Sequence, residues 1–113
     1  MIARTFRAIA TVENAPAYQR FFEETVAPAL ARIDGHLGAM ILTREEAGGI
    51  AIQVVTFWQA MDAVRRFAGE PPDRAVVEPE ARALLVGFDE RVVHHEVALD
   101  TLTGSPRTHR RES

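Results

Sequence analysis

The stretch that decides the fold is residues 48–70, GGIAIQVVTFWQAMDAVRRFAGE. Its first half, residues 50–57, is rich in β-branched and aromatic residues, which predicts a strand. Its second half changes period, because apolar residues recur at three-residue steps at Met61, Val64 and Phe67. This spacing predicts a short helix over residues 60–67, and Gly69 suits the left-handed position after a helix end. Trp58, the chain's single tryptophan, therefore marks a strand-to-helix junction.

The strand predicted at residues 50–57 is apolar on both faces. Because side chains alternate along a strand, Ile52 and Val54 share one face, while Val55 and Phe57 share the other. The segment at residues 36–44, HLGAMILTR, predicts a second strand with the same property. A sheet with one face under helices and the other in water shows polar alternation instead. The second face therefore predicts a covering partner, and a closed two-fold homodimer is the simplest one.

The remaining segments complete the order of elements. Residues 2–12 predict a strand, and apolar residues spaced three and four apart predict a helix between residues 13 and 33. In that helix Asn14 is expected to cap the first turn, and Pro28 predicts a kink or a fresh helical turn. Residues 45–49 predict the turn of a hairpin. A connection rich in proline, a short helix starting near Glu78 and a last strand at residues 89–99 follow.

The resulting order is βαββαβ with one extra short helix. It predicts an α+β fold, a ferredoxin-like sandwich in which helices cover one face of an antiparallel sheet. We expect one domain at residues 1–98. Residues 99–113 are polar and without periodicity, which predicts a flexible C-terminal tail.

Composition narrows the possible classes of function. The chain has 113 residues, no cysteine, and a net charge of −3, and all 13 of its basic residues are arginine. The absence of cysteine excludes disulfides, thiolate nucleophiles and cysteine-bound metals. The arginines are dispersed among acidic residues, so the sequence predicts no nucleic-acid surface. It also predicts no membrane span and no export signal, and hence a cytoplasmic location.

Several features together resemble a known family. They are the βαββαβ order, Trp58 at the end of the third strand, FAGE at residues 67–70, and PEARALLVGFDERVVHHEV at residues 79–97. This combination resembles the antibiotic biosynthesis monooxygenase-like proteins of the dimeric α/β-barrel superfamily, over roughly residues 1–98. The resemblance implies a dimeric barrel made of two sheets packed face to face. It also implies a pocket between sheet and helices in each subunit.

The resemblance further implies an activity, and it can be checked position by position. Some members oxidise polycyclic aromatic compounds with O₂ and no metal or flavin, while others open haem. The pocket tryptophan of active members corresponds here to Phe67, and Trp58 corresponds to a structural strand-end tryptophan. The first-strand segment RTFRA at residues 4–8 contains no asparagine, and residues 69–82 contain no histidine to bind haem. The haem-opening activity is therefore disfavoured.

Trp58 and Phe67 have two possible roles. They can form an aromatic wall that stacks on a flat substrate, or they can close the core between the helix and the sheet. Because Phe67 shares the apolar stripe of its helix, core packing is favoured for both.

His94 and His95 are the candidate catalytic residues. Adjacent residues on a strand point to opposite faces, so only one of the two can line a pocket, and they cannot bind one metal together. That imidazole could act as a general base, whereas a structural or exposed histidine is the commoner case. His36 is expected at an exposed or interface position, and His109 lies in the tail.

Four further residues are candidates for binding substrate. Arg4 and Phe6 share one face of the first strand, and Arg7 lies on the other. An inward arginine would bind a carboxylate or enolate, or would pair with an acid such as Glu96. Tyr18 lies on the apolar stripe of the first helix, where its hydroxyl could orient a substrate or make one structural hydrogen bond.

The sequence therefore leads to one function with stated alternatives. We expect a cofactor-independent, metal-free monooxygenase-like protein that binds a small aromatic or enolisable molecule, with a histidine at residue 94 or 95 as the base. The alternatives are a non-catalytic dimeric module that binds a small ligand or has a stress or regulatory role, and an isomerase or decarboxylase on the same fold.

Overall fold

The computed structural model describes residues 1–102 and 107–108. Its main sheet runs in the order β2-β3-β1-β4, with β5 also paired to β1, and every pairing in it is antiparallel. The strands are β1 (Ile2–Ala10), β2 (His36–Glu46), β3 (Gly49–Trp58), β4 (Leu85–Phe88) and β5 (Val93–Glu96). The helices are α1 (Ala15–Phe21), η1 (Phe22–Val26), α2 (Ala27–Ala31), α3 (Met61–Ala68) and α4 (Pro79–Leu84). The predicted α+β fold is confirmed.

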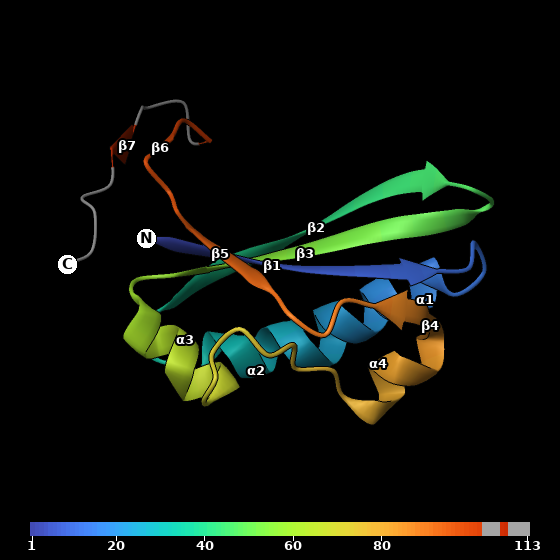
Figure 1. Ribbon diagram of the computed structural model, residues 1–113, viewed down its shortest axis with the longest axis horizontal. Helices are drawn as coiled ribbons and strands as arrows, with labels where there is room; N and C mark the ends of the chain where they lie inside the picture. The colour runs from blue at the N-terminus through green and yellow to red at the C-terminus, as the bar shows by residue number, and fades with distance from the viewer. Residues whose placement is uncertain (103–106, 109–113) are drawn as a thin grey trace.

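The helices all lie on one face of the sheet, and the opposite face carries no helix (Figure 1). The buried side chains of β3 alternate as a one-sided strand requires, with Ile52, Val54, Thr56 and Trp58 facing the helices. Trp58, Ile52 and Val64 are the largest fully buried side chains. The core therefore sits between β1, β3 and the helices.

The opposite face, which we call the outer face, remains apolar in part. Its residues on β1 and β2 include Ile9 and Leu42, which are 50% and 46% exposed. Val93 on β5 pairs with Thr5 of β1 on the same face and is 51% exposed. This arrangement leaves the apolar face that the strand pattern predicted uncovered within a single chain.

The first helical segment differs in detail from the prediction. Between α1 and α2 the chain forms a π-helical turn, η1, in which the N–H of Ala27 donates to the carbonyl of Phe22. Pro28 has no N–H and its ring crowds the carbonyl four residues earlier, and a wider turn relieves that clash. The expected disturbance at Pro28 is thus present as a π turn just before it.

Asn14 is the N-cap residue of α1, as predicted, but the hydrogen bonds at this cap differ from those expected. The Asn14 side chain makes no capping hydrogen bond. Its backbone N–H instead donates to the hydroxyl of Thr11 at 3.1 Å, and the Thr11 carbonyl accepts from the N–H of Ala15 at 3.0 Å. Strand β1 therefore ends at Ala10, earlier than the predicted residue 12, because Thr11 already belongs to the turn.

The single last strand predicted at residues 89–99 is wrong. Strand β4 pairs with β1, the chain then leaves β1, and strand β5 pairs with β1 again. In between, the N–H of Val92 donates to the carbonyl of Asp73 at 2.8 Å, and the N–H of Ala75 donates to that of Glu90 at 2.8 Å. Residues 90–92 therefore pair with the proline-rich connection instead of with β1, and this pairing holds the connection against the sheet.

The region predicted as a tail contains some regular structure. Strand β6 (Leu99–Asp100) pairs with β7 (Arg107–Thr108) in a two-stranded sheet of its own. His109, predicted to lie in the tail, is outside the described residues. Within the described ranges, no helix has the length and apolar character needed to cross a bilayer.

Candidate functional site

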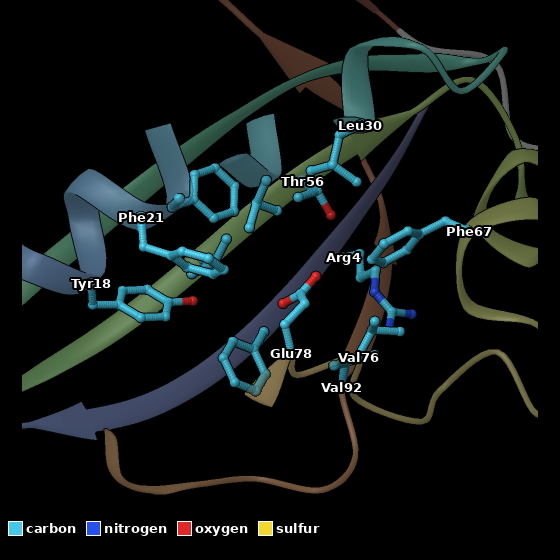
Figure 2. Close-up of a pocket in the computed structure, with 13 residues that line it drawn as sticks. Arg4, Tyr18, Phe21, Leu30, Thr56, Phe67, Val76, Glu78 and Val92 are labelled. Carbon is cyan, nitrogen blue, oxygen red and sulfur yellow. The ribbon is translucent and has the colours of Figure 1, made fainter. Parts of the chain in front are cut away.

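A pocket lies between the inner face of the sheet and the helices (Figure 2). Its floor comes from β1 and β3, and its opposite wall from α1, η1 and α2. The connection between α3 and α4 and the segment before β5 close the remaining sides. The cavity measures about 50 Å³. Its lining is mostly aromatic and aliphatic, with four polar residues: Arg4, Tyr18, Thr56 and Glu78.

Arg4 is the buried cation of this pocket, with 4% of its surface exposed. Its Nη1 donates to the carbonyl of Pro72 and lies 3.1 Å from Nε2 of His94, and its Nη2 donates to the carbonyl of Arg74 at 2.8 Å. These partners are uncharged, and the ion pairs within residues 1–102 do not include Arg4. The structural pairing with Glu96 that the sequence allowed is not formed.

The free donors of Arg4 have a useful geometry. A guanidinium carries five N–H groups, and the three contacts above leave Nε and one hydrogen of Nη2 without a partner in the described structure. Nε and Nη2 share one edge of the guanidinium, and donors on that edge can bind a carboxylate or an enolate oxygen. The guanidinium also lies 5.5 Å from the ring centre of Phe67. Burial lowers the pKa of Arg4 to about 10.

His94 and His95 point to opposite faces, as predicted. His94 pairs with Arg4 across the β1–β5 ladder and lies on the inner face, whereas His95 pairs with Ala3 and is exposed on the outer face. Neither imidazole is among the residues that line the pocket. Burial, and then the charge of Arg4, lowers the pKa of His94, so its Nε2 can accept from Arg4. His94 thereby positions Arg4, and a catalytic role for either histidine stays a prediction.

Tyr18 and Glu78 face each other across the pocket, with the phenol hydroxyl directed toward the carboxylate (Figure 2). Tyr18 is 5% exposed, and its hydroxyl has no hydrogen-bond partner within the described residues. Burial raises the pKa of Tyr18 to about 12, and the negative charge of Glu78 contributes to this rise. The phenol therefore stays protonated at neutral pH and is available as a hydrogen-bond donor.

Trp58 closes the core and does not line the pocket. It is fully buried, its N–H donates to the hydroxyl of Thr56 at 2.9 Å, and its ring stacks on Phe67 at 5.5 Å. His36 packs edge-on against the other side at 4.7 Å. The favoured interpretation of the junction thus agrees with the structure for Trp58. Phe67 packs on Trp58 and also lines the pocket, and its role as a wall for a flat substrate stays a prediction.

The other predicted binding residues divide between the two faces. Phe6 lines the pocket beside Arg4. Arg7 is exposed on the outer face and lines a groove there with Leu42 and Gln53. The strand brings Arg4 and Phe6 to the inner site and directs Arg7 away from it, as its alternation requires.

Sequence reasoning missed two polar residues of the site, Thr56 and Glu78. This glutamate lies in the run VVEPE between two predicted elements, where an acidic residue usually faces solvent. It also missed Val76 and Val92, which come together because residues 90–92 pair with the connection. Pro79 gave a partial signal, since proline is common in the first turn of a helix and places Glu78 at its start.

Comparison with known proteins identifies relatives by structure. No family model and no curated protein matches the sequence. A single-substitution mutant of MhuD with two manganese protoporphyrin IX molecules per active site is 26% identical, with a TM-score of 0.63 over 88% of this chain and 97% of that one. The haem degrader MhuD of Mycobacterium tuberculosis, with two haems bound, is 24% identical, with a TM-score of 0.61 over 88% and 98%. A candidate antibiotic biosynthesis monooxygenase from Deinococcus radiodurans is 17% identical, with a TM-score of 0.53 over 86% and 92%.

These relatives raise the question of whether the pocket here fits haem. The lining residues supply no histidine. The cavity of about 50 Å³ is also far below the roughly 300–1,000 Å³ of pockets that bind drug-sized ligands. No group of three or more His, Asp or Glu in residues 1–102 could hold a metal ion. The residues present therefore do not fit haem.

Proposed function

We propose that this chain, which has the fold of the antibiotic biosynthesis monooxygenase-like proteins, is a monooxygenase-like enzyme that acts without a cofactor on a small aromatic or enolisable substrate. The observation that carries the proposal is Arg4, a buried cation with two free donors in an aromatic pocket. Arg4 forms no ion pair within the described residues, although the charge of Asp73 acts on it from beyond contact distance, and a buried charge without a close counterion is costly unless it meets a ligand of opposite charge. The enolate or carboxylate oxygen of a substrate would supply that charge.

The chemistry follows from stabilising an enolate in a dry site. Removal of a proton beside a carbonyl leaves an electron-rich carbon, and the negative charge moves to the carbonyl oxygen held by Arg4. That carbon then reacts with O₂. A CH₂ group becomes C=O with one oxygen atom, the second oxygen leaves as water, and the two C–H bonds supply the four electrons. The aromatic lining excludes water during the reaction.

The size of the pocket limits the substrate. A cavity of about 150 Å³ binds one benzene ring, so a single-ring compound needs roughly 100 Å³ more than the closed site provides. Val76 stands in the wall and is 40% exposed, so its side chain can move outward. A polycyclic substrate would need several lining residues to move together. The geometry therefore favours a single aromatic ring.

The proposed enzyme is a homodimer. The exposed apolar residues of the outer face, Ile9, Leu42 and Val93, would be buried against the same face of a second copy. The pocket opens on the other side of the sheet, so dimerisation leaves it accessible. Sedimentation at micromolar concentration tests this assembly, and a stable monomer would contradict it.

Oxygen uptake tests the activity. The probe is phenylpyruvate, which has one ring, an enolisable CH₂ and a carboxylate. We expect uptake of one O₂ per substrate, and Arg4→Met should lower the rate by about 10²–10³-fold, the effect of removing one oxyanion donor. Arg7→Met is the matched control, because Arg7 lies on the same strand but faces outward. Equal losses in both variants, or no uptake by the wild-type protein, would contradict the proposal.

Two alternatives have distinct support. His94, the expected base, contacts Arg4 and does not line the pocket, which favours a ligand-binding module without catalysis. Such a module would bind phenylpyruvate and leave it unchanged. An isomerase would interconvert its keto and enol forms without consuming O₂.

A further inference from the structure

Glu78 is an unpaired carboxylate inside the pocket. It occupies the residue before the first turn of α4, where its side chain makes no capping hydrogen bond. The carboxylate of Glu78 forms no ion pair or hydrogen bond with any residue in 1–102. Figure 2 shows its carboxylate directed into the space between Tyr18 and Arg4. A half-buried carboxylate in an aromatic cavity without a partner is available to a ligand.

The neighbours of Glu78 define which proton it can accept. Tyr18 stays protonated at neutral pH, because burial and the Glu78 charge both raise its pKa. The phenol is therefore a donor and cannot be the base. Arg4 is a donor as well, and His94 contacts it from outside the lining. Of the lining residues, Glu78 is the one that carries a carboxylate, a group that can act as a general base.

The two charged groups also define the ligand. Arg4 favours a negative oxygen at one position, and Glu78 favours a hydrogen that can leave as a proton at another. One aromatic ring in this space needs roughly 100 Å³ more than the closed cavity provides, so lining side chains, Val76 among them, would move outward to admit it. We infer that Glu78 is the proton-accepting catalytic residue of this pocket and that its substrates are single-ring aryl keto acids with an enolisable CH₂. This inference rests on the proposed function and names its base and substrate class.

The proton-transfer step is balanced without an oxidant. A benzylic C–H bond of the keto acid breaks, and its proton forms an O–H bond with the Glu78 carboxylate. The electron pair forms the C=C bond of the enolate, and the charge on the carbonyl oxygen is held by Arg4. In the reverse direction Glu78 returns a proton to carbon. In D₂O the returned proton is a deuteron.

Deuterium exchange under nitrogen isolates this step from any reaction with O₂. The benzylic protons of phenylpyruvate in D₂O are followed by NMR, and the uncatalysed exchange in buffer is subtracted. We expect the wild-type protein to accelerate exchange and Glu78→Gln to lower the enzymatic rate by about 10²-fold or more, the usual contribution of a general base. Glu80→Gln is the matched control, because Glu80 lies two residues further on α4, is exposed, and does not line the pocket.

Two measurements separate a failed base from a failed fold. Glu78→Asp keeps the carboxylate on a shorter side chain, so we expect it to retain more exchange than Glu78→Gln. Titration of the tyrosinate absorbance should show a lower Tyr18 pKa in Glu78→Gln and an unchanged one in Glu80→Gln, because only Glu78 acts on the phenol. Exchange at the wild-type rate in Glu78→Gln, or none above buffer in the wild-type protein, overturns the inference.

The oxygen assay distinguishes failure of the role inferred for Glu78 from failure of the proposed monooxygenase function. Exchange that depends on Glu78 without oxygen uptake supports the inference and overturns the monooxygenase proposal. Oxygen uptake that survives Glu78→Gln supports the proposal and overturns the role of Glu78.

Discussion

Tyr18 provides a direct test of the pocket through stability at alkaline pH. Its phenol has an ordinary pKa of 10.0, which burial and Glu78 raise to about 12 in the folded protein. The pKa of Tyr18 is higher in the folded protein than in the unfolded chain. At a pH between these two pKa values, the native state therefore holds a proton that the unfolded chain has lost. Stability from this group is therefore fully present below pH 10 and is lost as the pH rises toward 12.

The magnitude follows from the size of the pKa difference. Each pH unit corresponds to about 1.4 kcal/mol, so two units remove about 3 kcal/mol of unfolding free energy. Arg4 has the opposite effect, because burial lowers its pKa to about 10, below the ordinary value of an arginine, and stability therefore rises as the pH increases above 10. The wild-type curve alone would show the two effects partly cancelling. The difference between wild type and Tyr18→Phe isolates the phenol, since Arg4 is present in both proteins.

The assay is urea unfolding at a series of alkaline pH values, followed by the fluorescence of Trp58. Trp58 and Tyr18 are the chain's only tryptophan and tyrosine, so each signal reports one site. We expect the free energy of unfolding of Tyr18→Phe, relative to wild type, to increase by about 1.4 kcal/mol per pH unit above pH 10. A difference independent of pH, or a tyrosinate titration with an ordinary midpoint, would refute the burial of this phenol beside Glu78.

Three further predictions address other parts of the structure. Acidification below pH 6.5 should destabilise the protein, because the native state keeps His94 uncharged while the unfolded chain takes up a proton. In urea unfolding, His94→Gln should therefore flatten the dependence of stability on pH. An unchanged slope would count against the contact between His94 and Arg4. Gly35→Ala should lower the free energy of unfolding by about 1–3 kcal/mol in the same assay, because Gly35 has a φ of 92° and an added Cβ would lie 2.6 Å from the Cβ of Ala63. Gly87→Ala is the control, because a Cβ added there meets nothing within 4 Å. Equal effects of the two substitutions would contradict this packing. Leu42→Glu on the outer face should convert the proposed dimer to a monomer in sedimentation. Val12→Glu should leave the dimer intact, because Val12 is a similarly exposed apolar residue that lies off the sheet. A dimer that survives Leu42→Glu would place the interface elsewhere.

The sequence predicted the sheet well, because its strands carry strong local signals. The period-two pattern of β3, the hairpin turn and the helix after Trp58 are each set by neighbouring residues. The phase of the pattern also separated Arg4 from Arg7 and His94 from His95. It could not say which member of each pair faces the helices, because both faces of these strands carry apolar residues.

The site was harder to predict, because it depends on contacts between distant segments. Glu78 enters the pocket only because the proline-rich connection pairs with residues 90–92, and that pairing has no period to recognise. The same pairing breaks the last strand and places Val92 in the wall. The role of His94 depended on its distance from Arg4, a residue 90 positions away in the chain. The outer face was predicted as a dimer interface, and that stays a prediction.

The most direct measurement of the central claim is a crystal structure of the Glu78→Gln protein soaked with phenylpyruvate. We expect one molecule in the pocket, with its ring among the aromatic lining residues, its keto or carboxylate oxygen bound to Arg4, and its benzylic carbon beside residue 78. A ligand bound on the outer face, or a pocket that stays closed at saturating phenylpyruvate, would contradict it.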